Sequence, residues 1–158
     1  MSKPTSPAFD PMDLEPRIGS GYPEQFQEGC ETREKRRLGE YGGLVNFGVN
    51  LTTLPPGQGS AIRHWHTMQD EFVYVVSGEL TLITDAGEQI LTPGMCAAFP
   101  KNVPDGHCLV NRSDAPASYL EIGDRTPGDE GSYPKDDLKA ALGPDGKWMF
   151  THKDGSPY

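Results

Sequence analysis

The sequence predicts a single all-β domain built from short antiparallel strands. The chain has 158 residues, of which 19 are Gly and 15 are Pro, and this density of turn-forming residues favours many short elements over long helices. Within residues 41–122, apolar and β-branched runs are separated by Gly, Pro and Asp turns at intervals of roughly eight to twelve residues. Evenly spaced short strands of this kind indicate an antiparallel sandwich or barrel.

Composition divides the chain into three segments. Residues 1–40 are interrupted by five prolines and are expected to form an irregular N-terminal arm. Residues 41–122 are expected to form the barrel, and residues 123–158, rich in Gly, Pro and charge, a C-terminal extension packed on it. The eight predicted strands are 44–54, 61–66, 71–76, 79–84, 89–91, 95–99, 107–111 and 117–122. The best helix candidate is short and covers residues 135–142.

Charge and cysteine content narrow the functional classes. The net charge of −9 disfavours binding to nucleic acid, because an acidic chain is repelled by phosphate backbones. No apolar run approaches the roughly 18 residues that span a bilayer. The three cysteines, Cys30, Cys96 and Cys108, are too widely spaced for a disulfide framework. We therefore expect a cytoplasmic protein without a nucleic-acid or membrane partner.

Three of the four histidines lie in the region of predicted strands, residues 41–122. His64 and His66 are two residues apart in a predicted strand, so their side chains share a face and can converge on one ion. Glu71 begins the next strand, and His107 begins a later one after a Pro-Asp-Gly turn. Three neutral imidazoles and one carboxylate leave up to two positions open on an octahedral ion, which suits catalysis or ligand binding. Asp70 is the alternative to Glu71 as the carboxylate ligand, but its side chain is expected to face away from the face that carries Glu71, Val73 and Val75.

The stretch from residue 57 to residue 111 resembles the two sequence motifs of the cupin superfamily. The first motif is matched by Gly59 (or Gly57), His64, His66, Glu71 and Gly78. The second is matched by Gly94, Pro100, Gly106, His107 and Asn111. Between Pro100 and His107 the chain is about two residues longer than the family pattern, and Asn102 stands where the family usually has Gly.

The resemblance implies a double-stranded β-helix, a small jelly-roll-like barrel with a metal ion inside. It implies that His64, His66, Glu71 and His107 bind one divalent ion; Fe, Mn, Ni and Zn are not distinguished. The whole chain is similar to a subgroup of small bacterial cupins, which supplies a fold and a site but no substrate.

Other side chains are assigned by alternation along the strands. Trp65 lies between two candidate ligands, so we expect it on the outer surface of its strand, and Cys108 is turned away from the metal in the same way. Cys96 is expected in the core, and Asn111 is expected to make hydrogen bonds at a strand end. His152 is expected to be an ordinary surface residue. Five polar residues could reach a ligand or lie at a solvated rim, and the sequence does not separate these alternatives: Arg63, Asp105, Arg112, Tyr119 and Glu121.

The predicted metal site favours an enzyme, although the sequence names no catalytic residue. A divalent ion with one carboxylate keeps positive charge and attracts small anionic chelators such as keto acids, hydroxy acids, enediols or sugar acids. The chain is therefore interpreted as a metal-dependent oxygenase, isomerase or lyase; the alternative is a non-catalytic cupin that binds or senses a small ligand. A purely structural barrel is disfavoured, because it needs no ligand set.

We also expect a homodimer. The flanking segments carry apolar groups that a barrel of this size does not fully cover, among them Phe9, Ile18, Tyr22, Trp148 and Phe150. Exposed sheet edges also favour pairing between copies.

Overall fold

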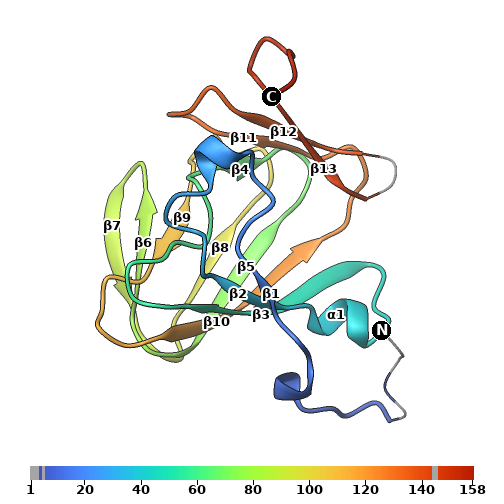
Figure 1. The fold of residues 1–158 in the computed structure, drawn as a ribbon, viewed down its shortest axis with the longest axis vertical. Coiled ribbons are helices and arrows are strands. Elements are labelled where there is room, and N and C mark those ends of the chain that lie inside the picture. The colour runs from blue at the N-terminus through green and yellow to red at the C-terminus, as the bar shows by residue number, and fades with distance from the viewer. Residues whose placement is uncertain (1–3, 5, 144–145) are drawn as a thin grey trace.

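The computed structural model describes residues 4, 6–143 and 146–158, and strands dominate it (Figure 1). The strands are β1 (Arg17–Ile18), β2 (Glu34–Arg36), β3 (Phe47–Leu54), β4 (Trp65–His66), β5 (Glu71–Ser77), β6 (Leu80–Thr84), β7 (Gly87–Leu91), β8 (Cys96–Phe99), β9 (Cys108–Val110), β10 (Ala117–Asp124), β11 (Glu130–Ser132), β12 (Lys139–Leu142) and β13 (Trp148–Thr151). The helical elements in the described part of the chain are two 3₁₀ turns, η1 (Pro11–Asp13) and η2 (Glu24–Phe26), and one α-helical turn, α1 (Leu38–Tyr41). No described helix is long enough to cross a membrane.

The strands of the described residues form three sheets. The largest has the order β1-β2-β3-β10-β5-β8, a second has the order β13-β12-β11-β4, and the third has the order β7-β6-β9. The first and third sheets pack face to face through apolar side chains of both. This core consists of Leu54, Val73, Val75, Leu80, Leu82, Leu91, Leu109, Ala117 and Tyr119. The all-β, jelly-roll-like prediction is confirmed.

Each of the eight predicted strands overlaps an observed strand, but the second observed strand is much shorter than predicted. Of residues 61–66, only Trp65 and His66 form a strand, β4. His64 makes an isolated antiparallel bridge with His107, in which His107 N donates to His64 O at 2.9 Å. The bridge brings two of the predicted ligands together across the chain.

The helix predicted over residues 135–142 is wrong. Lys139–Leu142 form strand β12, which pairs with β11 on one side and β13 on the other. A helix of two turns is marginal by itself, whereas pairing on both sides satisfies the backbone of this segment and buries Ala140. Order in the C-terminal extension thus comes from long-range pairing, which reaches β4 and the candidate site through β11.

A smaller apolar cluster joins the two ends of the chain. Tyr133, Leu138 and Ala140 are buried there, and Tyr22, Phe26, Ile62 and Phe150 pack against them. The N-terminal arm therefore covers the C-terminal sheet beside the segment that carries His64.

The structure accounts for the asparagines at two positions of the second motif, 102 and 111. Asn102 is the one non-glycine residue with positive φ among those described, at 58°, a conformation that Asn adopts more readily than most residues. Asn111 is fully buried, and its Nδ2 donates to the carbonyl oxygens of Leu54 at 2.7 Å and Ala115 at 2.8 Å. The predicted hydrogen-bonding role of Asn111 is confirmed.

Gly78, in the turn between β5 and β6, is expected to tolerate no side chain. Its φ is +74°, and an added Cβ lies 2.7 Å from the Cα of Ala117. We expect Gly78→Ala to lower the free energy of unfolding by about 2–4 kcal/mol, from the left-handed backbone and the overpacking together. Gly57→Ala is the control, because its φ is +80° but an added Cβ meets nothing within 4 Å. Equal denaturant midpoints for the two variants would show that the contact with Ala117 does not contribute to the destabilisation.

Candidate metal centre

Four side chains from four places in the chain meet on the inner side of the sheets. His64 lies just before β4, His66 is the last residue of β4, Glu71 is the first residue of β5, and His107 lies just before β9. The bridge between residues 64 and 107 and the pairing of Glu71 with Phe99 of β8 fix these positions.

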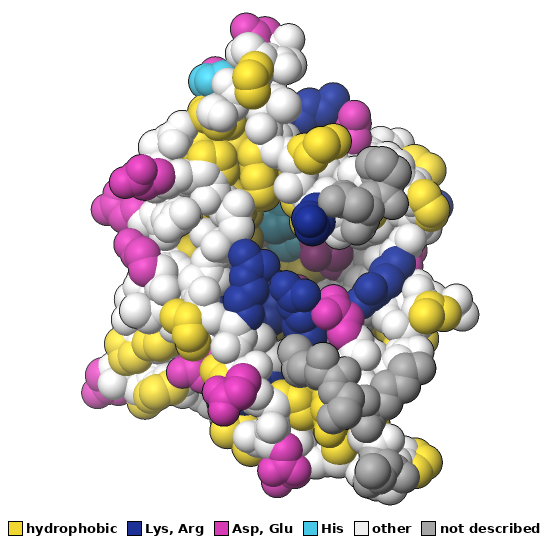
Figure 2. All heavy atoms as spheres, turned by 45° about the vertical axis from the view of Figure 1, so that its right-hand side comes forward, with side chains coloured by type: hydrophobic (Ala, Val, Ile, Leu, Met, Phe, Trp, Pro, Cys, Tyr) yellow, Lys and Arg dark blue, Asp and Glu magenta, His cyan; other side chains and the backbone are white. Residues whose placement is uncertain are grey.

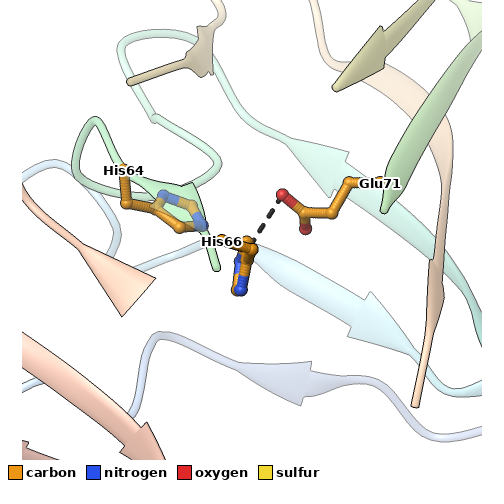
Figure 3. A group of neighbouring side chains, drawn as sticks. All are labelled: His64, His66 and Glu71. Atoms are coloured by element: carbon orange, nitrogen blue, oxygen red, sulfur yellow. Dashed lines mark ion pairs between the residues drawn. The ribbon is translucent and has the colours of Figure 1, made fainter. Parts of the chain in front are cut away.

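The ligand atoms are close enough to share one ion. One ligand atom each of His64, His66 and Glu71 lies within 4.8 Å of the others, and Figure 3 shows both imidazoles near the Glu71 carboxylate. The Oε2 atom of Glu71 is 3.5 Å from His66 Nε2 and 3.0 Å from His107 Nε2. His107 stands outside the group of three but reaches it through this oxygen.

The far side of each imidazole is held by a different contact. His64 Nδ1 donates to the carbonyl oxygen of Ile62 at 2.7 Å, and His66 Nδ1 donates to Asp129 Oδ2 at 2.5 Å. In its neutral form each of these two rings keeps an unprotonated Nε2, the arrangement typical of metal-binding histidines. The Nδ1 of His107 is buried without a partner among the described residues, and its ring is stacked on Phe99 with centroids 3.5 Å apart. The donor set fits a divalent ion.

The protonation states favour metal binding at two of these groups. Burial lowers the pKa of His64 to about 4, so this ring is neutral at physiological pH. Burial by itself raises the pKa of Glu71, but the hydrogen bond with His107 and the charge of His66 hold it well below its usual range. A neutral imidazole and an ionised carboxylate are the forms that bind metals.

Asp129, a buried residue that the sequence analysis missed, supports His66 from behind. Besides its bond to His66, its Oδ1 accepts a hydrogen bond from Met68 N at 2.8 Å. Although burial lowers the pKa of His66, the hydrogen bond to Asp129 and the charge of Glu71 raise it above its usual value. No motif marks Asp129, because it is 63 positions from His66 in sequence.

Asp129→Asn is expected to weaken metal binding about 10–100-fold, the usual cost of losing a ligand's hydrogen-bond partner. A metal ion must displace the proton of His66, so affinity rises as the pH increases through that pKa. Without the Asp129 charge the pKa of His66 falls, so the rise in metal affinity with pH occurs at lower pH. Metal titrations from pH 5 to 8 measure both effects. Asp137→Asn is the control, because it removes an Asp–His pair at the surface, with His152; similar losses in both variants would rule out a specific role for Asp129.

A cavity of about 90 Å³ opens on the cluster. Its lining consists of Trp65, His66, Glu71, Ala98, Phe99, Pro100, Val103, Asp105 and His107. The expectation that Trp65 faces only the outer surface is wrong: it lines this cavity and a second one of about 300 Å³ beside β11 and β12. Strict alternation fails because β4 has only two residues and follows a bent segment.

The structure separates the five polar residues that the sequence left open. Arg63 donates to the carbonyl oxygen of Gly106, and Arg112 forms a surface ion pair with Glu88. Tyr119 is 1% exposed and belongs to the apolar core. The remaining two, Asp105 and Glu121, lie near the candidate ligands.

Glu121 lies on the same face of the large sheet as Glu71. It pairs in register with Val73, two residues after Glu71 on β5, so the three side chains point to one side. Its Oε1 accepts hydrogen bonds from Lys35 Nζ at 2.8 Å and Asn50 Nδ2 at 3.1 Å. Burial raises the pKa of Glu121, but the charge of Lys35, its hydrogen bond and the charge of Arg33 together outweigh burial and lower that pKa. An ionised carboxylate therefore lies beside the cluster without belonging to it.

The remaining assignments are partly confirmed. Asp70 accepts a hydrogen bond from Lys101 N and is turned away from the cluster, as expected. Cys108 is buried, and burial raises its pKa to about 11, which leaves an unreactive thiol. The expectation that Cys96 is a core residue is wrong: it is exposed, because β8 turns Ala97 and Phe99 inward instead.

Comparisons with known proteins agree with this geometry. A family model described as "Cupin domain" matches residues 50–123, and no match was found among the curated proteins. The structure of a sugar phosphate isomerase from a cupin superfamily, from Silicibacter pomeroyi, is 47% identical, with a TM-score of 0.90 and coverage of 96% of either chain. A proposed sugar phosphate isomerase from Acidithiobacillus ferrooxidans is 28% identical, with a TM-score of 0.71 and 80% coverage of either chain.

A more distant structure shows a likeness in fold alone. It is described as a predicted oxalate decarboxylase from Thermotoga maritima and is 16% identical, with a TM-score of 0.62 over 75% of this chain and 99% of its own.

Proposed function

The chain belongs to the cupin superfamily, and on that premise we propose that it is a metal-dependent isomerase of a small phosphorylated sugar. His64, His66, Glu71 and His107 hold the ion in this proposal. Zn, Mn, Fe and Ni all accept such a set of three imidazoles and one carboxylate. When bound, the ion acts as a Lewis acid on the oxygens of a chelating substrate.

The observation that carries the proposal is the placement of Glu121. A non-catalytic binding site needs no further acid or base, whereas an isomerase must move a proton between neighbouring carbons. Glu121 is ionised, lies on the face that carries Glu71, and is held by Lys35 and Asn50. It is also close enough to the cluster for its charge to raise the pKa of His66 and for the charge of Glu71 to raise its own pKa.

Glu121 acts as the base in this scheme. It takes a proton from the carbon next to the substrate carbonyl and returns it to the former carbonyl carbon, while a hydroxyl proton moves to the other oxygen. Atoms and charge balance, and no oxidant is consumed. The sugar phosphate isomerase from Silicibacter pomeroyi, at 47% identity, supports this reaction class over an oxygenase or lyase.

The reaction class is tested by incubating metal-loaded and metal-stripped protein with a panel of aldose and ketose phosphates. We expect interconversion in the loaded protein, loss of it on stripping and recovery on reloading, with no oxygen consumed. Metal-dependent oxygen uptake would favour an oxygenase. Metal-dependent ligand binding without turnover of any substrate would favour the non-catalytic cupin.

We propose further that the protein is a homodimer, although the apolar side chains that favour this assembly are not all those expected from the sequence. Phe9 packs on Tyr41, and Tyr22 and Phe150 pack in the smaller apolar cluster, so these side chains need no partner subunit. Ile18 and Trp148 stay exposed, as expected, and further exposed apolar surface lies on the outer face of β5, where Phe72, Tyr74 and Val76 are 37%, 42% and 46% exposed. Light scattering is expected to give twice the mass of one chain, and a monomer at high concentration would contradict this.

A further inference from the structure

Positive charge gathers on one side of the candidate site in a chain whose net charge is −9. Figure 2 shows a hollow with histidine and acidic side chains at its bottom and Lys and Arg side chains around its rim. Such a concentration of one sign in a hollow attracts ligands of the opposite charge more strongly than the same charges spread over a surface.

The first strands of the large sheet carry positive charge near the candidate base. Arg17 of β1 pairs in register with Lys35 of β2, so their side chains lie on one face about 5 Å apart. Lys35 contacts Glu121, which places the pair beside the candidate base. Arg33 and Arg37 are near enough to Arg17 for their charges to lower its pKa, after the larger effect of its burial.

These cations differ in whether a carboxylate of the protein already neutralises their charge. Arg37 lies 3.1 Å from Glu40, and Arg125 lies 3.6 Å from the same carboxylate. Arg33 is buried and held by the carbonyl oxygens of Ser60 and Gly19, which carry no net charge. Arg17 forms no ion pair with any residue that the structure describes. The group therefore has more positive charge than its own carboxylates neutralise.

We propose that Arg17, Lys35 and Arg37 form a binding subsite for the phosphate group of the substrate, separate from the metal ion. Guanidinium groups match phosphate oxygens with paired, charge-assisted hydrogen bonds. With the phosphate at this rim, the sugar extends toward Glu121 and the His/Glu cluster. The inference rests on the proposed function for the identity of the substrate, but the subsite can be measured without any turnover.

The direct test is the binding of inorganic phosphate to metal-stripped protein at low ionic strength, by calorimetry. We expect Arg17→Ala to weaken phosphate binding about 10–100-fold, as loss of a charge-assisted contact predicts, and Arg17→Lys to restore part of it. Arg112→Ala is the control, because Arg112 pairs with Glu88 at the surface. Equal binding in Arg17→Ala and the control, or phosphate binding only when metal is present, would overturn the subsite.

Kinetics give a second readout. Arg17→Ala is expected to raise KM for a phosphorylated sugar while metal content and proton exchange on a small unphosphorylated hydroxyketone stay at wild-type levels. An unchanged KM would overturn the subsite alone. Intact phosphate binding in a protein that isomerises no sugar phosphate would overturn the proposed function alone.

Discussion

Replacing His66 with alanine is expected to lower metal affinity by at least about 100-fold, more than loss of a ligand's hydrogen-bond partner usually costs. The variant removes a nitrogen that lies 3.5 Å from Glu71 Oε2, and it leaves the Asp129 carboxylate buried without its imidazole partner. Three donors around an open site bind an ion far more weakly than four. Calorimetry with Zn²⁺ or Mn²⁺ measures the loss.

His152→Ala is the matched control, because His152 pairs with Asp137 at the surface and does not belong to the cluster. Its metal affinity is expected to equal that of the wild type. Full metal occupancy in His66→Ala would mean that the ion is held elsewhere. Circular dichroism of both variants separates loss of a ligand from loss of the fold.

Glu121→Gln is expected to lower turnover about 10²–10⁴-fold, the usual contribution of a positioned base, while metal affinity stays within a few-fold of wild type. The amide keeps the shape of the side chain and can still accept a hydrogen bond from Lys35, but it cannot take a proton. Deuterium incorporation from D₂O at the carbon next to the carbonyl reports this step even when the substrate equilibrium is unfavourable.

Glu88→Gln is the matched control, since it removes an exposed carboxylate paired with Arg112. Wild-type deuterium exchange in Glu121→Gln would eliminate Glu121 as the base. Loss of metal together with loss of exchange would instead make Glu121 a residue that positions the cluster.

The sequence predicts the barrel strands well because their limits are local. Turns with Gly, Pro or Asp lie between most of these strands. Alternation identifies Val73 and Val75 as inward-facing, as the core confirms. The same logic brings His64, His66 and Glu71 together, although His64 precedes the strand instead of lying in it.

Residues that act over long sequence distances could not be predicted in this way. Lys35 reaches Glu121 across 86 positions, and Asp129 reaches His66 across 63. The helix expected at β12 is wrong because the pairing partners of this segment, β11 and β13, have only three and four residues and are not recognisable as strands from the sequence pattern. The basic rim depends on the same long-range pairing, since it forms only when β1 and β2 join the large sheet.

Anomalous diffraction from crystals of the metal-loaded protein tests the four-ligand centre most directly. We expect one strong peak per chain, about 2.0–2.2 Å from a nitrogen of each of His64, His66 and His107 and from an oxygen of Glu71, with Glu121 outside the coordination sphere. A peak at any other group of side chains, or no peak in protein that retains stoichiometric metal in solution, would contradict this assignment.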